Sequence, residues 1–358
     1  MSIAEHVINA ARWAPSGDNA QSWRFQILHD YAFIVDASDT RQQVVYDYFG
    51  RPSQIALGAL LETARIAASK LGYRADIQRL DKELTAVNAE RLRYRVDLIY
   101  QAGLPADPLF AMIEKRSVNR RSLSTQPLQE QHIKILQEAL GNSFRLRCFA
   151  STQEKRRFAS IWWKNAHIRL TMPEAYPVHK RVIAWNSRFS PDKIPDQALG
   201  ADTLSLKMMR WCLQSWQRIQ FMNRYLGGTL LPRLQLDLLP ALNCAAHFTL
   251  EASQAPRSVD EFVLAGQALQ RFWLSATQLG LQMQPAMTPL IFNWYAESQI
   301  PCTRDAKVWQ EVLQLQRHLQ QQLGSAQLSR TVFMGRLGYG DLAHARSLRL
   351  PLEHLLSH

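Results

Sequence analysis

The sequence has few cysteines, and none of them is placed for a metal site or a disulfide framework. Four cysteines occur in 358 residues, far apart, with no CxxC pair and no histidine at metal-ligand spacing: Cys148, Cys212, Cys244 and Cys302. Zinc sites and disulfide-stapled domains need closely spaced or paired cysteines. We therefore expect buried, reduced thiols in a cytoplasmic protein and no structural metal.

Long hydrophobic runs are also missing. The segment 1–15 has no basic stretch followed by an uninterrupted apolar one, and the most apolar later segment, 55–71, is interrupted by Glu62, Arg65 and Lys70. These features predict neither a signal peptide nor a membrane span. Low-complexity tracts are absent as well, and a hydrophobic content of 47% with 20% charged residues is typical of a folded globular chain.

Positive charge is in excess and is concentrated in the middle of the chain. The formal net charge is +12, and the segment 151–240 holds fourteen basic against six acidic residues, with five of the ten tryptophans. Basic residues interleaved with aromatic ones can form a surface for single-stranded nucleic acid. The large apolar residues between 208 and 226, however, recur at intervals of three and four, which predicts the inner stripe of one amphipathic helix. No nucleic-acid-binding motif accompanies them, so we favour the helix and expect no nucleic-acid partner.

Two segments far apart in the chain are similar to each other. Residues 55–73 align without a gap on residues 263–281, so that Gly58 matches Gly266 and the glycines near the two ends also match. Each segment predicts a helix that ends at a glycine in the left-handed conformation. Two alanine-rich helices can look alike by chance, but the glycines in register favour a duplication. Small residues on one side of each helix predict that the copies pack against each other or against equivalent neighbours.

Around this repeat, the sequence predicts a mixed fold of the α+β class. β-rich runs occur at 24–28, 32–35, 92–99, 145–149, 248–250 and 331–337, and further helical patterns at 129–140 and 307–323. We expect two related halves, residues 1–105 and 106–358. The second half carries a long insertion, about 158–245, that belongs to neither copy of the repeat.

Three separated stretches combine turn-forming, polar and basic residues. The first, APSGDNAQSWRF at 14–25, supplies backbone donors, a hydroxyl and carboxamides in a tight space before a strand. The second, IEKRSVNRRS at 113–122, gathers three arginines before a helix, and the third, 335–353, places a glycine-rich bend beside Arg346 and Arg349. Arginine clusters of this kind hold phosphate groups. Taken alone, each stretch also fits an ordinary turn, a helix cap or a solvated face.

Taken together, the three stretches resemble the FMN-dependent nitroreductase superfamily. Residues 14–25 look like its APSxxNxQPW element, 116–120 like its RRSxR element, and 334–353 like its closing strand and arginine-bearing tail. In ordinary family members the arginine motif comes first and two chains form a dimer, whereas here the order is reversed and a helix is duplicated. That order is similar to the fused, Acg-like branch, which implies a nitroreductase-like fold with two related halves in one chain, a pseudo-dimer, and the insertion as a helical lid.

The resemblance also implies which residues contact FMN. Three polar side chains of the first stretch face its ribityl and isoalloxazine region, three arginines take its phosphate, and one proline lies in the segment that passes flavin N5. In that order, these residues are Ser16, Asn19 and Gln21; Arg116, Arg120 and Arg349; and Pro285. No side chain is expected to be catalytic, because flavin N5 carries the chemistry.

The chain departs from the family pattern in three respects. Ser22 replaces the proline of QPW, so the turn is less rigid. The arginine motif fits two registers: one keeps Arg116 and Arg120 with Val118 between them, and the other matches Arg116 and Ser117 directly. We prefer the first, because a second cation is worth more to a phosphate than one hydroxyl. Finally, only one half carries the arginine motif, which predicts a single FMN per chain.

The activity implied is that of an FMN-dependent oxidoreductase, with two-electron transfer from NADH or NADPH to a small conjugated acceptor such as a quinone, a nitroaromatic or an enone. Three alternatives remain open, in this order: a flavin-sequestering or sensing protein whose lid blocks nicotinamide, a flavin-dependent oxidase or desaturase of a small natural product, and nucleic-acid binding by the basic insertion. The expected partner is a small molecule, and the chain is either a monomeric pseudo-dimer or part of a further homo-oligomer.

Overall fold

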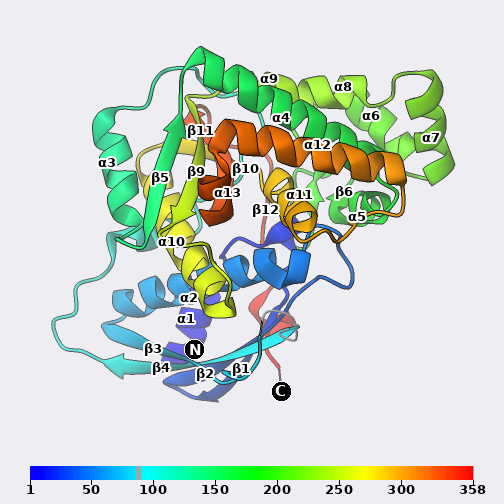
Figure 1. The fold of residues 1–358 in the computed structure, drawn as a ribbon. Helices are drawn as coiled ribbons and strands as arrows, with labels where there is room; N and C mark the ends of the chain where they lie inside the picture. Colours follow the sequence, from blue (N-terminus) through cyan, green and yellow to red (C-terminus); the bar gives the residue numbers. More distant parts are fainter. Residues whose placement is uncertain (86–89, 358) are drawn as a thin grey trace.

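The computed structural model describes residues 1–85 and 90–357, and it has the mixed α and β architecture that the sequence predicts. The chain forms two separate four-stranded antiparallel sheets. In Figure 1 the first sheet lies at the bottom of the molecule, and the second lies in the upper part, surrounded by helices. Within the described residues, no helix is both long and apolar enough to cross a lipid bilayer.

The first sheet is built by the N-terminal part of the chain. Its strands have the order β1-β2-β4-β3. A short helix, α1, precedes β1, and a capping box formed by Ser2 and Glu5 fixes its start. A long helix, α2, connects β2 to β3. The bounds are α1 Ile3–Ala11, β1 Trp23–His29, β2 Ala32–Ser38, α2 Arg51–Lys70, β3 Tyr73–Arg79 and β4 Arg91–Tyr100.

The second sheet repeats this topology. Its strands have the order β5-β9-β11-β10, a helix precedes the first strand, and a long helix again connects the second strand to the third. The bounds are α3 Glu130–Ala139, β5 Phe144–Phe149, β9 Ala246–Ala252, α10 Val259–Gln278, β10 Leu281–Pro285 and β11 Thr331–Tyr339. The same helix and strand order in both parts confirms the expectation of two related halves.

The duplicated helices pack directly against each other. A Cβ atom placed on Gly58 of α2 would overlap the carbonyl oxygen of Val263, and one placed on Gly266 of α10 would overlap that of Ile55. Ile55 and Val263 are equivalent positions of the repeat, so the contact has a local two-fold character. The two glycines permit this close approach, as the small residues of the sequence predict.

Most predicted elements are present, and two predictions are wrong. The segment 208–226 is not one helix but two, α6 Thr203–Cys212 and α7 Trp216–Tyr225. The chain breaks at Ser215, whose hydroxyl accepts a hydrogen bond from the backbone N–H of Arg218 and caps α7. The glycine-rich bend expected from residue 335 is also wrong, because strand β11, which was predicted over 331–337, continues to Tyr339. The sequence analysis also left β3 and β10 unassigned.

The glycines of β11 are explained by crowding. A Cβ at Gly335 would lie 2.6 Å from the carbonyl oxygen of Gln284, and one at Gly338 would lie 2.8 Å from the backbone nitrogen of Ala245. Glycine in a strand interior often marks such a close approach rather than a turn.

The inserted segment lies between β5 and β9 and covers residues 150–245. It begins with the long helix α4, which packs on the second half, and then forms short helices and two-residue strands. The predicted start at residue 158 therefore lies inside α4. The bounds are α4 Thr152–Thr171, α5 Ala175–Val182, β6 Ile183–Ala184, β7 Phe189–Ser190, β8 Ile194–Pro195, α6, α7, α8 Leu230–Arg233, a π-helical turn Leu234–Leu238 and α9 Leu239–Leu242.

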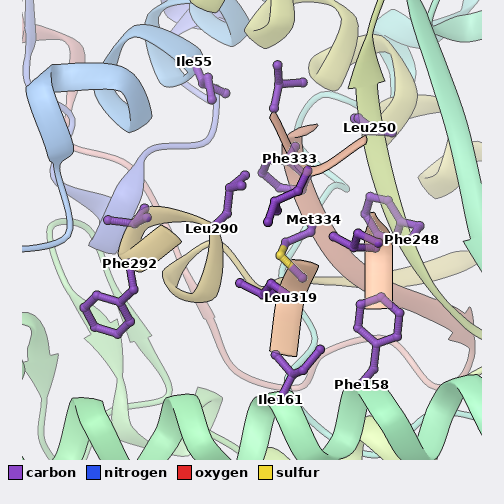
Figure 2. Packing of buried hydrophobic residues seen from close by; sticks show 14 of the residues in the cluster. Ile55, Phe158, Ile161, Phe248, Leu250, Leu290, Phe292, Leu319, Phe333 and Met334 are labelled. Carbon is purple, nitrogen blue, oxygen red and sulfur yellow. The ribbon is translucent and has the colours of Figure 1, made fainter. Parts of the chain in front are cut away.

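The larger hydrophobic core belongs to the second half. Three more helices follow β10: α11 Thr288–Glu297, α12 Ala306–Leu323 and α13 Ser325–Arg330. Figure 2 shows how their side chains meet those of α4 and the sheet, including Phe158 and Ile161 from α4, Leu290 from α11, Leu319 from α12 and Phe333 from β11. This core holds the insertion's first helix rigidly against the second sheet.

The C-terminal tail returns to the first half. Strand β12, Arg346–Ser347, pairs in parallel with β7 of the insertion. Beyond it, Leu356 forms a bridge with Phe25 of β1, and Arg12 Nη1 donates to the carbonyl oxygen of Leu350 (2.9 Å). Both termini accordingly lie beside the first sheet in Figure 1. The tail thus brings the arginines of the third sequence stretch to the loop that follows α1.

Candidate functional site

A cavity of about 500 Å³ lies where the two halves and the insertion meet. This volume is within the range of small-molecule and cofactor sites. The duplicated helices contribute Ile55 and Ala59 on one side and Leu269 and Trp273 on the other. The remaining walls come from the loop after α1, the segment 116–120, the start of α11, the tail and the insertion.

The loop after α1 is held in a strained conformation at the cavity wall. Asp18, Asn19 and Gln21 all have positive φ angles, of 50°, 61° and 47°. The hydroxyl of Ser16 accepts a hydrogen bond from the backbone N–H of Gln21 (3.1 Å), which closes the loop. Non-glycine residues in this region cost free energy, and such strain concentrates at functional sites. Ser16, Asp18 and Asn19 line the cavity.

The amides of Asn19 and Gln21 connect this loop to the insertion and the tail. Asn19 Nδ2 and Gln21 Nε2 both donate to the carbonyl oxygen of Pro191, at 3.0 and 2.8 Å. Gln21 Oε1 accepts from the backbone N–H of Leu350 (2.9 Å). Gln21 is buried and, contrary to the expectation that it faces the cofactor, does not line the cavity. Its side chain instead fixes the loop against the tail.

Three arginines meet at one end of the cavity, and none of them has a carboxylate partner in the described part of the chain. Arg349 donates to the carbonyl oxygens of Ala14 (3.0 Å) and Trp13 (3.3 Å) and to Asn19 Oδ1 (3.0 Å). Arg116 Nη2 also donates to the Trp13 carbonyl oxygen (3.1 Å). Arg346 Nη1 donates to the carbonyl oxygen of Glu114 (2.7 Å). We call Arg116, Arg346 and Arg349 the arginine trio.

The positive charge of the trio is only partly compensated: the carboxylate of Glu114 opposes the lowering of the pKa of Arg346, whereas no carboxylate in the described residues does so for Arg116 or Arg349. Burial, together with the positive charges of Arg349 and Arg346, lowers the pKa of Arg116 well below its ordinary value. Burial and the charge of Arg346 likewise lower the pKa of Arg349 to about 9. The Nε atom of Arg116 is buried without a hydrogen-bond partner in the described residues, and the guanidinium lies 4.5 Å from the ring centre of Trp273. Buried guanidinium groups in this state form a site for an anion.

Arg120 lies in a different charge environment from the trio. It lines the cavity, but its charged neighbours are Asp18 and Arg169 rather than Arg116 and Arg349. Asp18 faces this second group, and burial raises the pKa of its carboxyl while Arg120 opposes that rise. The sequence places Arg120 with the phosphate-binding arginines, whereas the structure groups it with Asp18.

The end of β10 forms the wall beside α11. Pro285 and Gln284 both line the cavity. Gln284 Oε1 accepts a hydrogen bond from Nε of the fully buried Arg336 (2.7 Å), whose Nη2 donates to the carbonyl oxygen of Arg121 (2.6 Å). Arg336 therefore holds the Gln284 side chain in place from the neighbouring strand.

The insertion closes the cavity with mainly apolar side chains. Its helices α6 and α7 contribute Met208, Met209, Trp216, Ile219 and Met222. Deeper in the wall, the hydroxyl of Tyr46 lies 3.1 Å from Nε2 of His179, and burial lowers the pKa of His179 to about 3. Arg169 of α4 is paired with Asp237 (2.6 Å).

Six of the seven residues implied by the resemblance line one cavity: Ser16, Asn19, Arg116, Arg120, Pro285 and Arg349. Charged or aromatic lining residues that were not predicted to contact the ligand include Asp18, Arg169, Trp273 and Arg346. Asp18 lies in the first motif between Ser16 and Asn19, and Arg346 lies in the third motif three residues before Arg349, so their positions were available signals. Nothing in the sequence pattern marks Arg169 and Trp273 as site residues.

No family model matches the chain. The chain is 22% identical over 293 residues to the uncharacterized protein MT1398 of Mycobacterium tuberculosis (strain CDC 1551 / Oshkosh), a match that covers 80% of this chain. The match spans only 39% of that protein's length.

Among solved structures, the chain is similar to nitroreductase-like flavoproteins. The FMN-dependent nitroreductase NfnB from Mycobacterium smegmatis, in complex with NADPH, is 14% identical, with a TM-score of 0.38 and coverage of 69% of this chain and 96% of that one. A BluB-like flavoprotein from Clostridium difficile 630 is 12% identical, with a TM-score of 0.38 and coverage of 70% and 99%.

Proposed function

We propose that the protein is an FMN-dependent oxidoreductase of the nitroreductase type, which transfers two electrons from NADH or NADPH to a small conjugated acceptor. The observation that carries this proposal is the arginine trio, three cations at one end of a cavity built by both halves, of which Arg116 and Arg349 are buried with no compensating carboxylate in the described residues. The motif resemblance supports the same identity for the ligand, because its first and third stretches meet in this cavity.

The residues present fit a flavin mononucleotide. Its phosphate would be held by the trio, and the anion would relieve the mutual repulsion of the three guanidinium groups. Ser16 and Asn19 would approach the polar part of the cofactor from the loop after α1. Pro285 and Gln284 would border the ring, with Trp273 and Leu269 beneath. Arg120 and Asp18 would then remain on the substrate side, which departs from the phosphate role that the resemblance implies for Arg120.

When bound, FMN supplies the hydride transfer chemistry, and the protein supplies position and environment. The strained loop holds Ser16 and Asn19 at the wall, and Arg336 fixes the amide of Gln284. Methionine and aromatic side chains of α6 and α7 exclude water above the cavity and offer an apolar surface to a flat conjugated acceptor. No side chain needs to act as a general base.

An absorbance spectrum of the purified protein, repeated after anaerobic addition of NADPH and then NADH, tests the proposal. We expect a flavin band that either nucleotide bleaches. Purified protein that shows no flavin and binds none when FMN is added back would contradict the cofactor assignment.

The cover formed by the insertion favours a second candidate, a protein that sequesters or senses flavin. If the insertion blocks nicotinamide, the flavin band would bleach with dithionite but with neither nucleotide. Rapid reoxidation by air of the dithionite-reduced flavin would instead indicate an oxidase or desaturase. The same sample therefore separates the three flavin-based readings.

A further inference from the structure

The outer side of the insertion exposes an unusual number of large apolar side chains. We define the exposed face by residues of α6 to α9 whose side chains lie in solvent: Leu204, Trp211, Phe221, Tyr225, Leu226, Leu230, Leu231, Leu234 and Leu239. Leu204 is 75% exposed and Tyr225 is 63% exposed. Figure 1 shows α6, α7 and α8 together at one corner of the molecule, away from both sheets. Large apolar side chains that are exposed together on neighbouring helices indicate an interaction site.

Helix α7 shows that these residues are not simply part of a core. None of its ten residues is buried. Trp216, Ile219 and Met222 face the cavity, whereas Phe221 and Tyr225 do not line it and point to solvent. The cavity accounts for the apolar side chains of Trp216, Ile219 and Met222. It does not account for Phe221 and Tyr225. The outward residues therefore need a separate explanation.

The charges on the same elements are mostly positive at the surface. Between residues 202 and 242 the basic residues are Lys207, Arg210, Arg218, Arg224 and Arg233, and the acidic residues are Asp202, which is exposed and caps α6, and Asp237. Asp237 is buried and paired with Arg169, so it does not offset the surface charge. Lys207, Arg210 and Arg224 are exposed between the apolar side chains.

We propose that the exposed face binds the surface of an anionic lipid membrane. Helices that lie in the membrane interface combine lysines and arginines with tryptophan, phenylalanine and leucine, and they bind through buried apolar area plus attraction to anionic headgroups. Leucines at the tips of α8 and the π-helical turn would enter the interface, and Lys207, Arg210 and Arg224 would reach the headgroups. This inference does not depend on the identity of the ligand in the cavity.

The charge pattern distinguishes the membrane from other occupants. A second copy of this chain docked through the same face would bring five basic residues against five, with Asp202 as the one exposed carboxylate among residues 202–242 to pair them. Single-stranded nucleic acid is bound by aromatic rings and cations, and it gives no partner to the five exposed leucines between 226 and 239. An anionic bilayer satisfies both the charge and the apolar side chains.

Co-sedimentation of the full chain with vesicles tests the proposal. We compare pure phosphatidylcholine with phosphatidylcholine containing about a third phosphatidylglycerol. We expect binding to the anionic vesicles that weakens as salt is raised, since added ions screen the headgroup attraction. Equal binding to both vesicle types, or binding to neither, would overturn the proposal.

Two sets of substitutions identify the surface. Lys207→Gln, Arg210→Gln and Arg224→Gln should each lower partitioning about fivefold. The triple variant Phe221→Ser, Leu226→Ser, Leu230→Ser should lower it at least about tenfold. None of these residues lines the cavity, so ligand binding there should be unchanged. Matched controls on distant helices are Lys134→Gln on α3 and Leu264→Ser on α10, both exposed.

The oligomeric state of the same samples tests the alternative that the exposed face binds a second copy of the chain. Light scattering without lipid should give the mass of one chain for the parent and for every variant. A parent dimer that the Phe221, Leu226 and Leu230 substitutions convert to a monomer would assign the exposed face to a second copy and refute membrane binding. The glutamine set keeps the test informative if the serine set fails to fold.

Discussion

Buried positive charge is costly, and the arginine trio concentrates it in one place. Arg116 and Arg349 are both nearly inaccessible, and the groups that accept their hydrogen bonds are neutral backbone carbonyls and the amide of Asn19. Desolvation lowers the pKa of both side chains, because burial makes the charged form less favourable than it is in water. Arginine remains protonated in proteins, so the buried charges lower the free energy of unfolding until an anion binds.

Replacing Arg116 by methionine should therefore separate stability from binding. Arg116→Met removes an uncompensated charge beside Arg349, and we expect the ligand-free protein to gain about 1 kcal/mol in unfolding free energy. The Trp13 carbonyl keeps a donor, Arg349 Nη2. FMN affinity should fall by about tenfold to a hundredfold through loss of a charge-assisted hydrogen bond to phosphate. Denaturant unfolding and fluorescence titration with FMN measure the two effects.

Arg120→Met is the matched control for that experiment. Arg120 has Asp18 and Arg169 as its charged neighbours, so its removal should change FMN affinity less than about threefold, a change too small for a lost phosphate contact. An equal loss of affinity in both variants would show that Arg120 also holds the phosphate, as the sequence motif implies.

A buried histidine in the second sheet predicts acid sensitivity. His247 is fully buried, stacks on Phe158 with ring centres 4.6 Å apart, and its Nε2 donates to the carbonyl oxygen of Ala241 (2.8 Å). Burial lowers its pKa to about 3. The unfolded chain takes up a proton near pH 6.5 and the folded chain does not, so the unfolding free energy should fall by about 1.4 kcal/mol per pH unit from about pH 6.5 towards pH 3.

The substitution His247→Phe should remove this contribution. Denaturant unfolding at about pH 6 and about pH 4.5 should show a pH dependence smaller by about one proton than in the parent protein. His344→Gln, at an exposed position, is the control and should leave the slope unchanged. An unchanged slope in His247→Phe would mean that His247 is already protonated in the folded state.

The sequence motifs predicted some of the site residues but not those that only the fold brings together. Ser16, Asn19, Arg116 and Arg349 stand in short motifs, so their types and spacing indicated a common ligand. Arg169 and Trp273 come from the insertion and the repeated helix, and only the fold brings them to the cavity. Arg120 lies in the predicted motif, but the direction of its side chain depends on packing that spacing does not encode.

At the scale of elements, the contact between α2 and α10 positions both walls of the cavity. Ile55 and Ala59 line the cavity from one helix, and Leu269 and Trp273 line it from the other. A Cβ on Gly58 would lie 2.9 Å from the Cα atom of Gly266, in addition to its overlap with the Val263 carbonyl oxygen. The separation of the two walls is therefore set by a pair of glycines.

Substituting either glycine should destabilise the protein and disturb the cavity together. Gly58→Ala or Gly266→Ala forces the helices apart, and we expect a loss of about 3 kcal/mol from overpacking, offset by about 1 kcal/mol of helix propensity. FMN affinity should fall as well. Gly17→Ala, whose Cβ would meet no atom within 4 Å, is the stability control. Unchanged melting temperatures in both helix variants would refute the close contact.

The type of most elements followed from local signals, whereas some boundaries did not. The helix repeat and six of the eight main strands were predictable from periodicity and terminal glycines. The glycines of β11 suggested a bend, because a sequence does not show that the neighbouring chain at Gln284 and Ala245 leaves no room for a side chain. The break between α6 and α7 depends on a single capping residue, Ser215, within an otherwise continuous apolar pattern.

At the scale of the whole molecule, the local two-fold contact raises the question of a second cavity. Under the repeat, Ala59 corresponds to Gln267 and Trp273 corresponds to Arg65. Ala59 and Trp273 line the cavity, whereas Arg65 Nη1 donates to Gln267 Oε1 (3.1 Å). Nearby, Arg271 Nη1 bridges the carboxylates of Glu62 (3.0 Å) and Asp107 (2.8 Å). On the opposite side of the α2–α10 pair, the positions equivalent to the cavity wall thus hold polar side chains that are paired with one another.

We therefore expect one FMN per chain, although the fold contains two related halves. The counterpart surface already pairs its arginines Arg65 and Arg271 with carboxylates, so it has no unneutralised cation for a phosphate, and a flavin there would have to displace these ion pairs. Titration of the flavin-free protein with FMN, followed by quenching of flavin fluorescence, should reach its end point at one equivalent. Arg116→Met should weaken that single phase, and Arg65→Gln should leave it unchanged. An end point of two equivalents would show that both sides of the α2–α10 pair bind flavin and that the asymmetry of the trio does not decide occupancy.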